Sequence, residues 1–165
     1  MVESRDTHLI QLHHFTCMAN LSNILSDGFL RTTESKVAFH HANGGPNVVW
    51  LTAQSTPEPG MIGLRQTDWA KSANPMLDKY RIRITVAVPR KQVVQWSKWA
   101  KAQRSSSNSM LKVVKASGGG ARSYYVIERP VMRQEWIEIV DMETGRYVPM
   151  VIPVGMKTIR PPMTG

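Results

Sequence analysis

A regular alternation of residue character between positions 80 and 88 constrains the fold more than any other feature of the chain. Apolar or aromatic side chains occupy every second position of this segment: Tyr80, Ile82, Ile84, Val86 and Val88. Successive side chains of a β-strand point to opposite faces of a sheet, so the pattern predicts a half-buried strand that Pro89 ends. The chain must therefore build a sheet around this segment.

Shorter apolar segments between turn residues predict the remaining strands of that sheet. We expect strands over residues 9–16, 48–52, 124–127 and 135–140, and an edge strand over residues 148–154. A short helix is expected from Asn20, as its N-cap, to Gly28, which suits the left-handed position that closes a helix. A basic amphipathic helix is expected over residues 92–104. Residues 53–78 are rich in Pro, Gly, Ser and Asn and predict a long loop.

Together these elements predict an α+β fold with one domain over residues 1–165 and a core from about residue 9 to residue 155. A chain of 165 residues is long enough for a single hydrophobic core. Cys17 is the only cysteine, which excludes an internal disulfide and a multi-thiolate metal site and favours a reducing, cytoplasmic location. The sequence shows no apolar stretch of membrane-spanning length and no apolar signal-peptide core, so no membrane partner is expected.

The balance of charge favours a negatively charged partner. A net charge of +9 and a sequence pI near 10.1 create a positive field, and nucleic acid is the favoured polyanion, ahead of an acidic protein or anionic lipid. A basic surface also keeps small domains soluble, so charge alone does not identify the partner. His40 and His41 lack nearby carboxylate or thiol companions, and no metal site is expected.

Three short motifs carry the chemical information. His14 and Thr16 end the first predicted strand on one face, where they can offer a donor and an acceptor to vicinal ribose hydroxyls. Trp50 and Thr52 end the second, and an indole stacks well on a planar cationic ring. Glu135 opens a later strand, where a fixed carboxylate can stabilise an oxocarbenium-like sugar. Glu138, three residues on, falls on the opposite face of that strand, and a register error would exchange the roles of the two carboxylates. Each motif also has a structural reading: a satisfied core histidine, a core tryptophan and a solvated strand glutamate.

The order and separation of these motifs resemble those of the ADP-ribosyltransferases, and the likeness is closest to the DarT-type toxins. The resemblance implies a split antiparallel β-sheet that binds NAD. It implies that His14 and Thr16 contact the adenosine ribose, while His13 points away. It also implies that Trp50, where the family commonly has Tyr, lies under the nicotinamide ring. Glu135 would then bind the nicotinamide ribose and stabilise its positive charge.

The remaining site residues follow from charge and from the resemblance. Arg31 can supply a forked donor to the pyrophosphate. DarT-type relatives modify nucleic acid bases, and we expect Lys98, Lys101 and Arg104 to hold the phosphate backbone of such an acceptor. A protein acceptor stays open.

Two other functions stay open as well. The first is a non-catalytic nucleic-acid-binding or protein-binding module on a degenerate transferase fold, because Trp50 replaces the usual Tyr. The second is an RNA 2'-phosphotransferase, which shares the fold and consumes NAD but requires a set of basic residues that this chain does not match.

Overall fold

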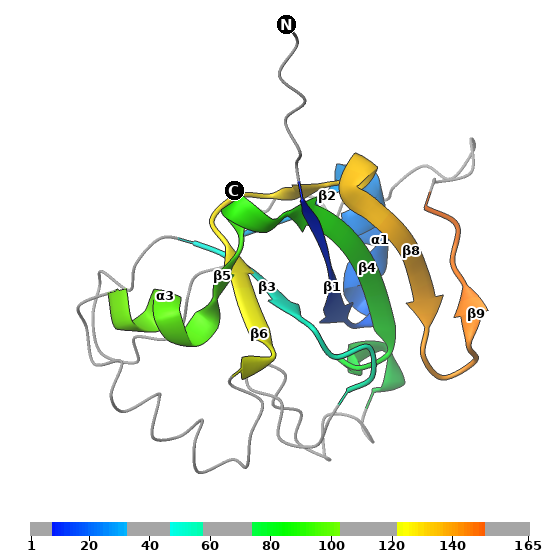
Figure 1. Cartoon of the computed structure of the whole chain (residues 1–165). Helices are drawn as coiled ribbons and strands as arrows, with labels where there is room; N and C mark the ends of the chain where they lie inside the picture. The colour runs from blue at the N-terminus through cyan, green and yellow to red at the C-terminus, as the bar shows by residue number, and fades with distance from the viewer. Residues whose placement is uncertain (1–7, 33–46, 58–73, 103–121, 151–165) are drawn as a thin grey trace, which may run out of the picture.

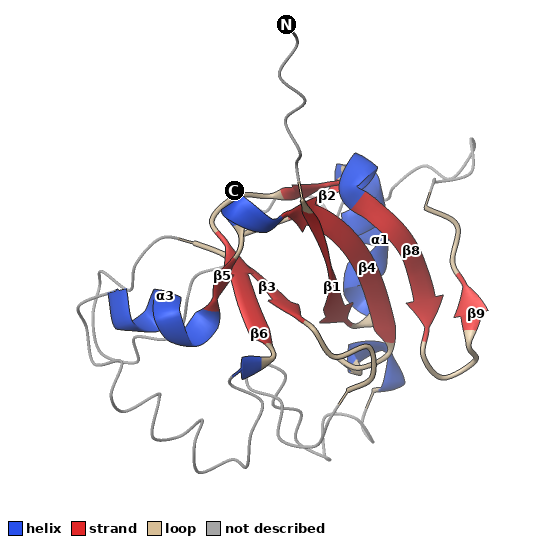
Figure 2. Cartoon of the chain, in the orientation of Figure 1, coloured by secondary structure: helices blue, strands red, loops and turns tan. Residues whose placement is uncertain are grey.

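The chain forms an α+β structure built around an antiparallel sheet (Figures 1 and 2). The computed structural model describes residues 8–32, 47–57, 74–102 and 122–150. Within these residues, seven strands form one sheet in the order β5-β6-β3-β1-β4-β8-β9, and β2 pairs with β7 in a separate two-stranded sheet. Each strand pair in both sheets is antiparallel.

The strands and helices follow one another along the chain with short connections where the structure describes them. The strands are β1 (Leu9–Thr16), β2 (Phe29–Leu30), β3 (Val49–Thr52), β4 (Ile82–Pro89), β5 (Val94–Gln95), β6 (Tyr124–Ile127), β7 (Val131–Met132), β8 (Trp136–Asp141) and β9 (Arg146–Tyr147). The helices are α1 (Met18–Asp27) and α3 (Trp96–Ala102), with 3-10 turns η1 (Pro75–Leu77), η2 (Arg90–Gln92) and η4 (Arg133–Glu135).

Strand positions agree closely with the sequence patterns. The predicted strands over residues 9–16 and 124–127 are confirmed as β1 and β6, and those over 48–52, 80–88 and 135–140 are confirmed as β3, β4 and β8 with ends shifted by one or two residues. The predicted edge strand over residues 148–154 is wrong for residues 148–150, which are not in a strand, and residues 151–154 lie outside the described part of the chain; the edge strand that pairs with β8 is β9. Of the predicted loop, residues 75–77 form η1, and residues 58–73 are not described.

Two helix boundaries differ from the prediction. The N-cap of α1 is Cys17, whose carbonyl accepts from the Asn20 backbone N–H, while the Asn20 side chain donates to Thr16 Oγ1 at 3.4 Å. Gly28 ends the helix as expected, with φ 76° in the left-handed region. The predicted helix over residues 92–104 begins only at Trp96, because Val94 and Gln95 pair with β6 as a short edge strand.

The large sheet is joined weakly between β1 and β3. Strand β1 pairs with β4 at eight positions, whereas it pairs with β3 at the single position where His13 faces Thr52. In Figure 1, β3 runs at an angle to β1 rather than alongside it. The junction is reinforced by a side chain, since His14 Nδ1 donates to the Trp50 carbonyl oxygen at 2.9 Å. The sheet therefore consists of two parts, β5-β6-β3 and β1-β4-β8-β9, that meet at His13 and His14.

The two faces of the sheet carry different cores. One face packs against α1, which lies behind β1 and β4 in Figure 1, and its apolar cluster includes Leu12, Leu21, Ile84 and Val86. The other face carries an aromatic cluster next to α3, made of Phe15, Val48, Trp96, Trp99, Tyr124 and Val126 with Trp50 packed against it. We call these the helix face and the aromatic face. On the aromatic face, polar residues lie directly beside the aromatic cluster.

Candidate functional site

A row of polar side chains crosses the aromatic face through the junction between the two parts of the sheet. Thr52 on β3 faces His13 on β1, His13 faces Thr85 on β4, and Thr85 faces Glu138 on β8. Three of the four side chains are nearly buried, with exposed fractions of 7% for His13, 3% for Thr52 and 1% for Thr85. Buried polar groups in the middle of a sheet lower stability unless they are hydrogen-bonded, so such a row calls for a functional explanation.

Hydrogen bonds connect three members of the row into a relay. Thr85 Oγ1 donates to Glu138 Oε1 at 3.1 Å and lies 3.0 Å from His13 Nδ1. A hydroxyl has one proton to donate, so Thr85 Oγ1 must accept from His13, and Nδ1 carries the imidazole proton. Nε2 of the neutral ring is then an acceptor, and no partner binds it among the described residues. This arrangement presents a proton-accepting nitrogen backed by a carboxylate.

Arg83 fixes the carboxylate at the far end of the relay. Its Nη2 donates to Glu138 Oε1 at 2.8 Å, and its Nη1 donates to the Ser55 carbonyl oxygen at 2.9 Å. The Arg83 side chain is 17% exposed and that of Glu138 is 26% exposed, so their ion pair is partly shielded from water. Arg83 thus ties the loop after β3 to β8 and holds the Glu138 carboxylate against Thr85.

A β-bulge aligns Thr85 with Glu138. The register of β4 with β8 shifts between Thr85 and Val86, so that Val86 faces Trp136 while Thr85 faces Glu138. Ile137 is the extra residue, and its side chain is 46% exposed. As a result Trp136 and Ile139, three residues apart, both belong to the apolar cluster of the helix face, and Glu138 lies on the aromatic face. Bulges of this kind often redirect side chains next to active sites.

The environment favours a neutral His13. Burial lowers the pKa of His13, and the positive charge of Arg83 lowers it further, while the negative charge of Glu138 partly counteracts both. The pKa of His14 is also lowered by burial, which its hydrogen bond to the Trp50 carbonyl partly offsets. Both imidazoles are therefore bases rather than cations near neutral pH.

The lowered histidine pKa values predict that acid weakens the fold. The native state holds both rings neutral, whereas the unfolded chain takes up protons below about pH 6.5. The stability gained from neutral rings is therefore complete above that pH and is lost as the pH falls toward the folded pKa values. We expect a loss of up to about 1.4 kcal/mol per pH unit for each ring. Urea unfolding at a series of pH values should show this slope, and a slope unchanged in His13→Asn and His14→Asn would contradict it.

Trp50 provides an aromatic surface beside the relay. It lies on the same face as Thr52, is half-buried, and its ring centroid is 6.1 Å from that of Trp96 and 6.4 Å from that of Tyr124. Tilted and edge-to-face packing fixes the indole orientation. Thr52 Oγ1 accepts from the Gln54 backbone N–H at 3.1 Å, which begins the turn after β3. The structure therefore brings together Trp50 and Thr52 from the predicted set and adds His13.

The predicted pair His14 and Thr16 lies on the opposite, helix face. The two side chains do share a face, as the strand period requires, but they are turned away from Trp50 and Thr52. His14 Nδ1 is engaged with the Trp50 carbonyl, and Thr16 is 6% exposed and accepts from Asn20. The structure thus assigns His14 to holding the junction, and the neighbour His13 to the polar row.

Glu135, the predicted catalytic carboxylate, lies in η4 rather than in the strand. Its two oxygens accept from Arg129 Nη2 and Nη1 at 2.7 and 2.8 Å, and Oε2 also accepts from the Met132 backbone N–H at 2.9 Å. Burial on its own would raise the pKa of Glu135, but these donors outweigh it and lower the pKa. These contacts tie the segment around β7 together, and Glu135 is not part of the polar row.

The predicted basic residues fall into separate places. Arg31 is exposed and its Nε donates at 2.8 Å to Oδ2 of Asp27, the last residue of α1. Lys98 is exposed on α3, Lys101 belongs to the same helix, and Arg104 lies outside the described residues. Arg31 already has an anionic partner, so the described structure leaves Lys98 as the better-supported candidate for an anionic ligand.

Sequence reasoning missed His13, Arg83, Thr85 and Glu138 as a connected group. The signal was present in β4, where Arg83 and Thr85 occupy the polar positions of an otherwise apolar strand. Their connection to β8 depends on the bulge, which no local pattern indicates.

Among the described residues, no group of three His, Cys, Asp or Glu side chains is placed to hold a metal ion. No helix in the described ranges is long and apolar enough to cross a bilayer. The chain matches no model of a protein family, no curated protein and no solved structure.

Proposed function

We propose that this protein is an NAD-dependent ADP-ribosyltransferase whose active site is the polar row at the junction of the sheet. The observation that carries the proposal is the relay from His13 through Thr85 to Glu138, placed one strand away from the aromatic surface of Trp50. The weak joint between β1 and β3 supports a split sheet.

In the proposed reaction, His13 acts as the general base. The bond between the nicotinamide nitrogen and the ribose carbon breaks, and neutral nicotinamide leaves with the electron pair. A nucleophilic N–H or O–H of the acceptor forms the new bond to that carbon and passes its proton to His13 Nε2. The carboxylate of Glu138 stabilises the resulting imidazolium through Thr85, as the carboxylate of a catalytic triad does.

Spacing decides how Glu138 participates. Trp50 on β3 and Glu138 on β8 are separated by three strand spacings of about 4.8 Å, or roughly 14 Å. A ribose attached to a ring on Trp50 lies close to His13, on the next strand, but not to Glu138. Glu138 is therefore a positioning residue that acts through Thr85, and His13 is the residue that meets the reacting atoms.

The residues on the aromatic face fit a dinucleotide such as NAD. Indole is the strongest aromatic surface for a cationic ring such as nicotinamide, and Trp50 is half-buried with its orientation fixed. We propose nucleic acid as the acceptor in preference to protein, because the net charge is +9 and Lys98 is exposed on α3.

The proposal is tested by incubating the protein with NAD labelled in its ADP-ribose part and with separate pools of DNA, RNA and protein. We expect label in a nucleic acid pool and release of one nicotinamide for each label transferred. If the protein neither released nicotinamide nor bound NAD, the proposal would be contradicted. Nucleic acid binding without NAD binding would then favour the non-catalytic module.

A further inference from the structure

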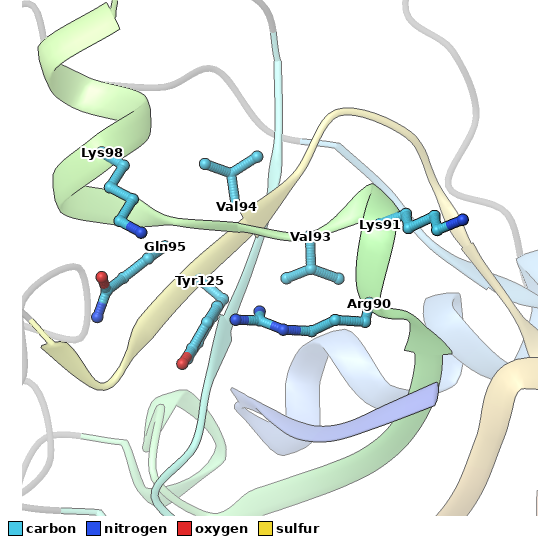
Figure 3. A pocket seen from close by; sticks show the side chains of 7 residues that line it. All are labelled: Arg90, Lys91, Val93, Val94, Gln95, Lys98 and Tyr125. Atoms are coloured by element: carbon cyan, nitrogen blue, oxygen red, sulfur yellow. The ribbon is translucent and has the colours of Figure 1, made fainter. Parts of the chain in front are cut away.

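A basic pocket lies at the edge of the sheet that is formed by β5 and β6. It has a volume of about 500 Å³, and Figure 3 shows the side chains that line it: Arg90, Lys91, Val93, Val94, Gln95, Lys98 and Tyr125. Three of the seven lining residues are cations and none is acidic, so the pocket favours an anion.

The pocket also has a planar surface. The Arg90 guanidinium carbon lies 5.6 Å from the centre of the Tyr125 ring, over its face. In Figure 3 the side chains of Arg90 and Lys98 extend toward Tyr125, whereas Lys91 points away. Guanidinium planes and aromatic rings are the surfaces on which unpaired nucleic acid bases stack. Val93, whose side chain lies on the same side of β5 as Tyr125 in Figure 3, adds an apolar wall.

The carboxylates that follow β6 do not neutralise these cations. Glu128 Oε1 accepts from Trp99 Nε1 at 2.7 Å, and Glu135 is held by Arg129. Within the described ranges no carboxylate pairs with Arg90 or Lys98, so their positive charge is available to a ligand. Phosphate oxygens are the usual partners of such cations in nucleic acid complexes.

We propose that this pocket binds single-stranded nucleic acid, with a base stacked on the plane formed by Arg90 and Tyr125 and a phosphate held by Lys98. The pocket belongs to the helix face, because Tyr125 pairs with Leu51 and packs against the helix-face cluster, so it lies on the other side of the sheet from the polar row. The inference goes beyond the proposed function, because the pocket and the polar row lie on opposite faces of the sheet and binding here requires no NAD. Failure of one proposal is thus distinguishable from failure of the other.

The test is fluorescence anisotropy of short labelled oligothymidylate and oligouridylate, measured without NAD at several salt concentrations. We expect Arg90→Gln with Lys98→Gln to weaken binding about tenfold and to reduce the slope of log affinity against log salt by about 0.7, because Lys98 makes the one proposed phosphate contact. Tyr125→Leu should weaken binding by at least about fivefold, through loss of stacking.

The matched control removes the same charge elsewhere. Lys79 and Arg146 are both exposed and line no part of the pocket, so Lys79→Gln with Arg146→Gln lowers the net charge equally. We expect that double variant to bind nearly as well as the parent. Equal weakening in the two double variants would overturn the proposal, because the general positive field would then account for binding. Binding to phosphatidylserine vesicles but not to the oligonucleotides would also overturn it. Thermal unfolding of each variant confirms that the fold is intact.

Discussion

Replacing His13 by asparagine is expected to lower the rate of nicotinamide release by about 10²- to 10⁴-fold, the usual contribution of a general base. Asparagine keeps a donor at the position of Nδ1, so the hydrogen bond to Thr85 and the buried row can be retained. It removes Nε2, the atom that we propose accepts the proton. The measurement is nicotinamide release from NAD, with and without the nucleic acid acceptor.

His14→Asn is the matched control for this prediction. The two histidines are adjacent, both are hydrogen-bonded through Nδ1, and both have lowered pKa values, but they lie on opposite faces of the sheet. Asparagine at position 14 can keep the donor to the Trp50 carbonyl. We expect it to retain most of the activity; if His14→Asn were inactive and His13→Asn active, the co-substrate would bind on the helix face.

Replacing Glu135 by alanine is expected to lower stability rather than activity. The change removes a bidentate contact with Arg129 and an acceptor for the Met132 N–H, in a partly buried setting where the Glu135 side chain is 18% exposed. Hydrogen bonds to charged groups contribute about 1.5–3 kcal/mol. For a chain of this size, a loss of about 2 kcal/mol corresponds to a fall in Tm of roughly 4–8 °C. Calorimetry or thermal unfolding measures the shift.

Arg129→Ala provides the companion measurement. If the Arg129–Glu135 ion pair stabilises the fold, the double variant Glu135→Ala with Arg129→Ala should lose less free energy of unfolding than the two single variants lose together. Nicotinamide release below the melting range should be close to that of the parent in all three variants. A normal Tm together with lost activity in Glu135→Ala would restore Glu135 as the catalytic carboxylate.

The strand pattern of this chain was readable from sequence because it depends on local periodicity. Strands β1 and β6 match their predicted bounds. The end of α1 was predictable as well, because a glycine such as Gly28 readily adopts the left-handed conformation that closes a helix. Asn20 was wrong as the N-cap because Cys17, already in an extended conformation, supplies the carbonyl that begins the helix. Backbone capping of this kind leaves no side-chain signature.

The site was harder to predict because it depends on pairing between distant strands. Strict alternation places Glu135 and Glu138 on opposite faces but does not say which face meets His13. The bulge at Ile137 places Glu138 on the face that carries His13, and it arises from the pairing of β4 with β8. Similarly, the choice between His13 and His14 depends on which of them faces Thr52 across the junction, a register between segments almost forty residues apart. Single-sequence patterns contain no information on such registers.

The most direct test of the proposed site compares Glu138→Gln with Glu135→Gln in nicotinamide release over a range of pH. We expect Glu138→Gln to lower the rate about 10- to 100-fold, since His13 loses the carboxylate behind it. We also expect the limb of the pH profile that reports His13 to move to lower pH, because Glu138 raises the pKa of His13. Glu135→Gln should leave the rate and the profile unchanged. The reverse result, with Glu135→Gln inactive and Glu138→Gln unaffected, would contradict the relay and place the reaction elsewhere on the sheet.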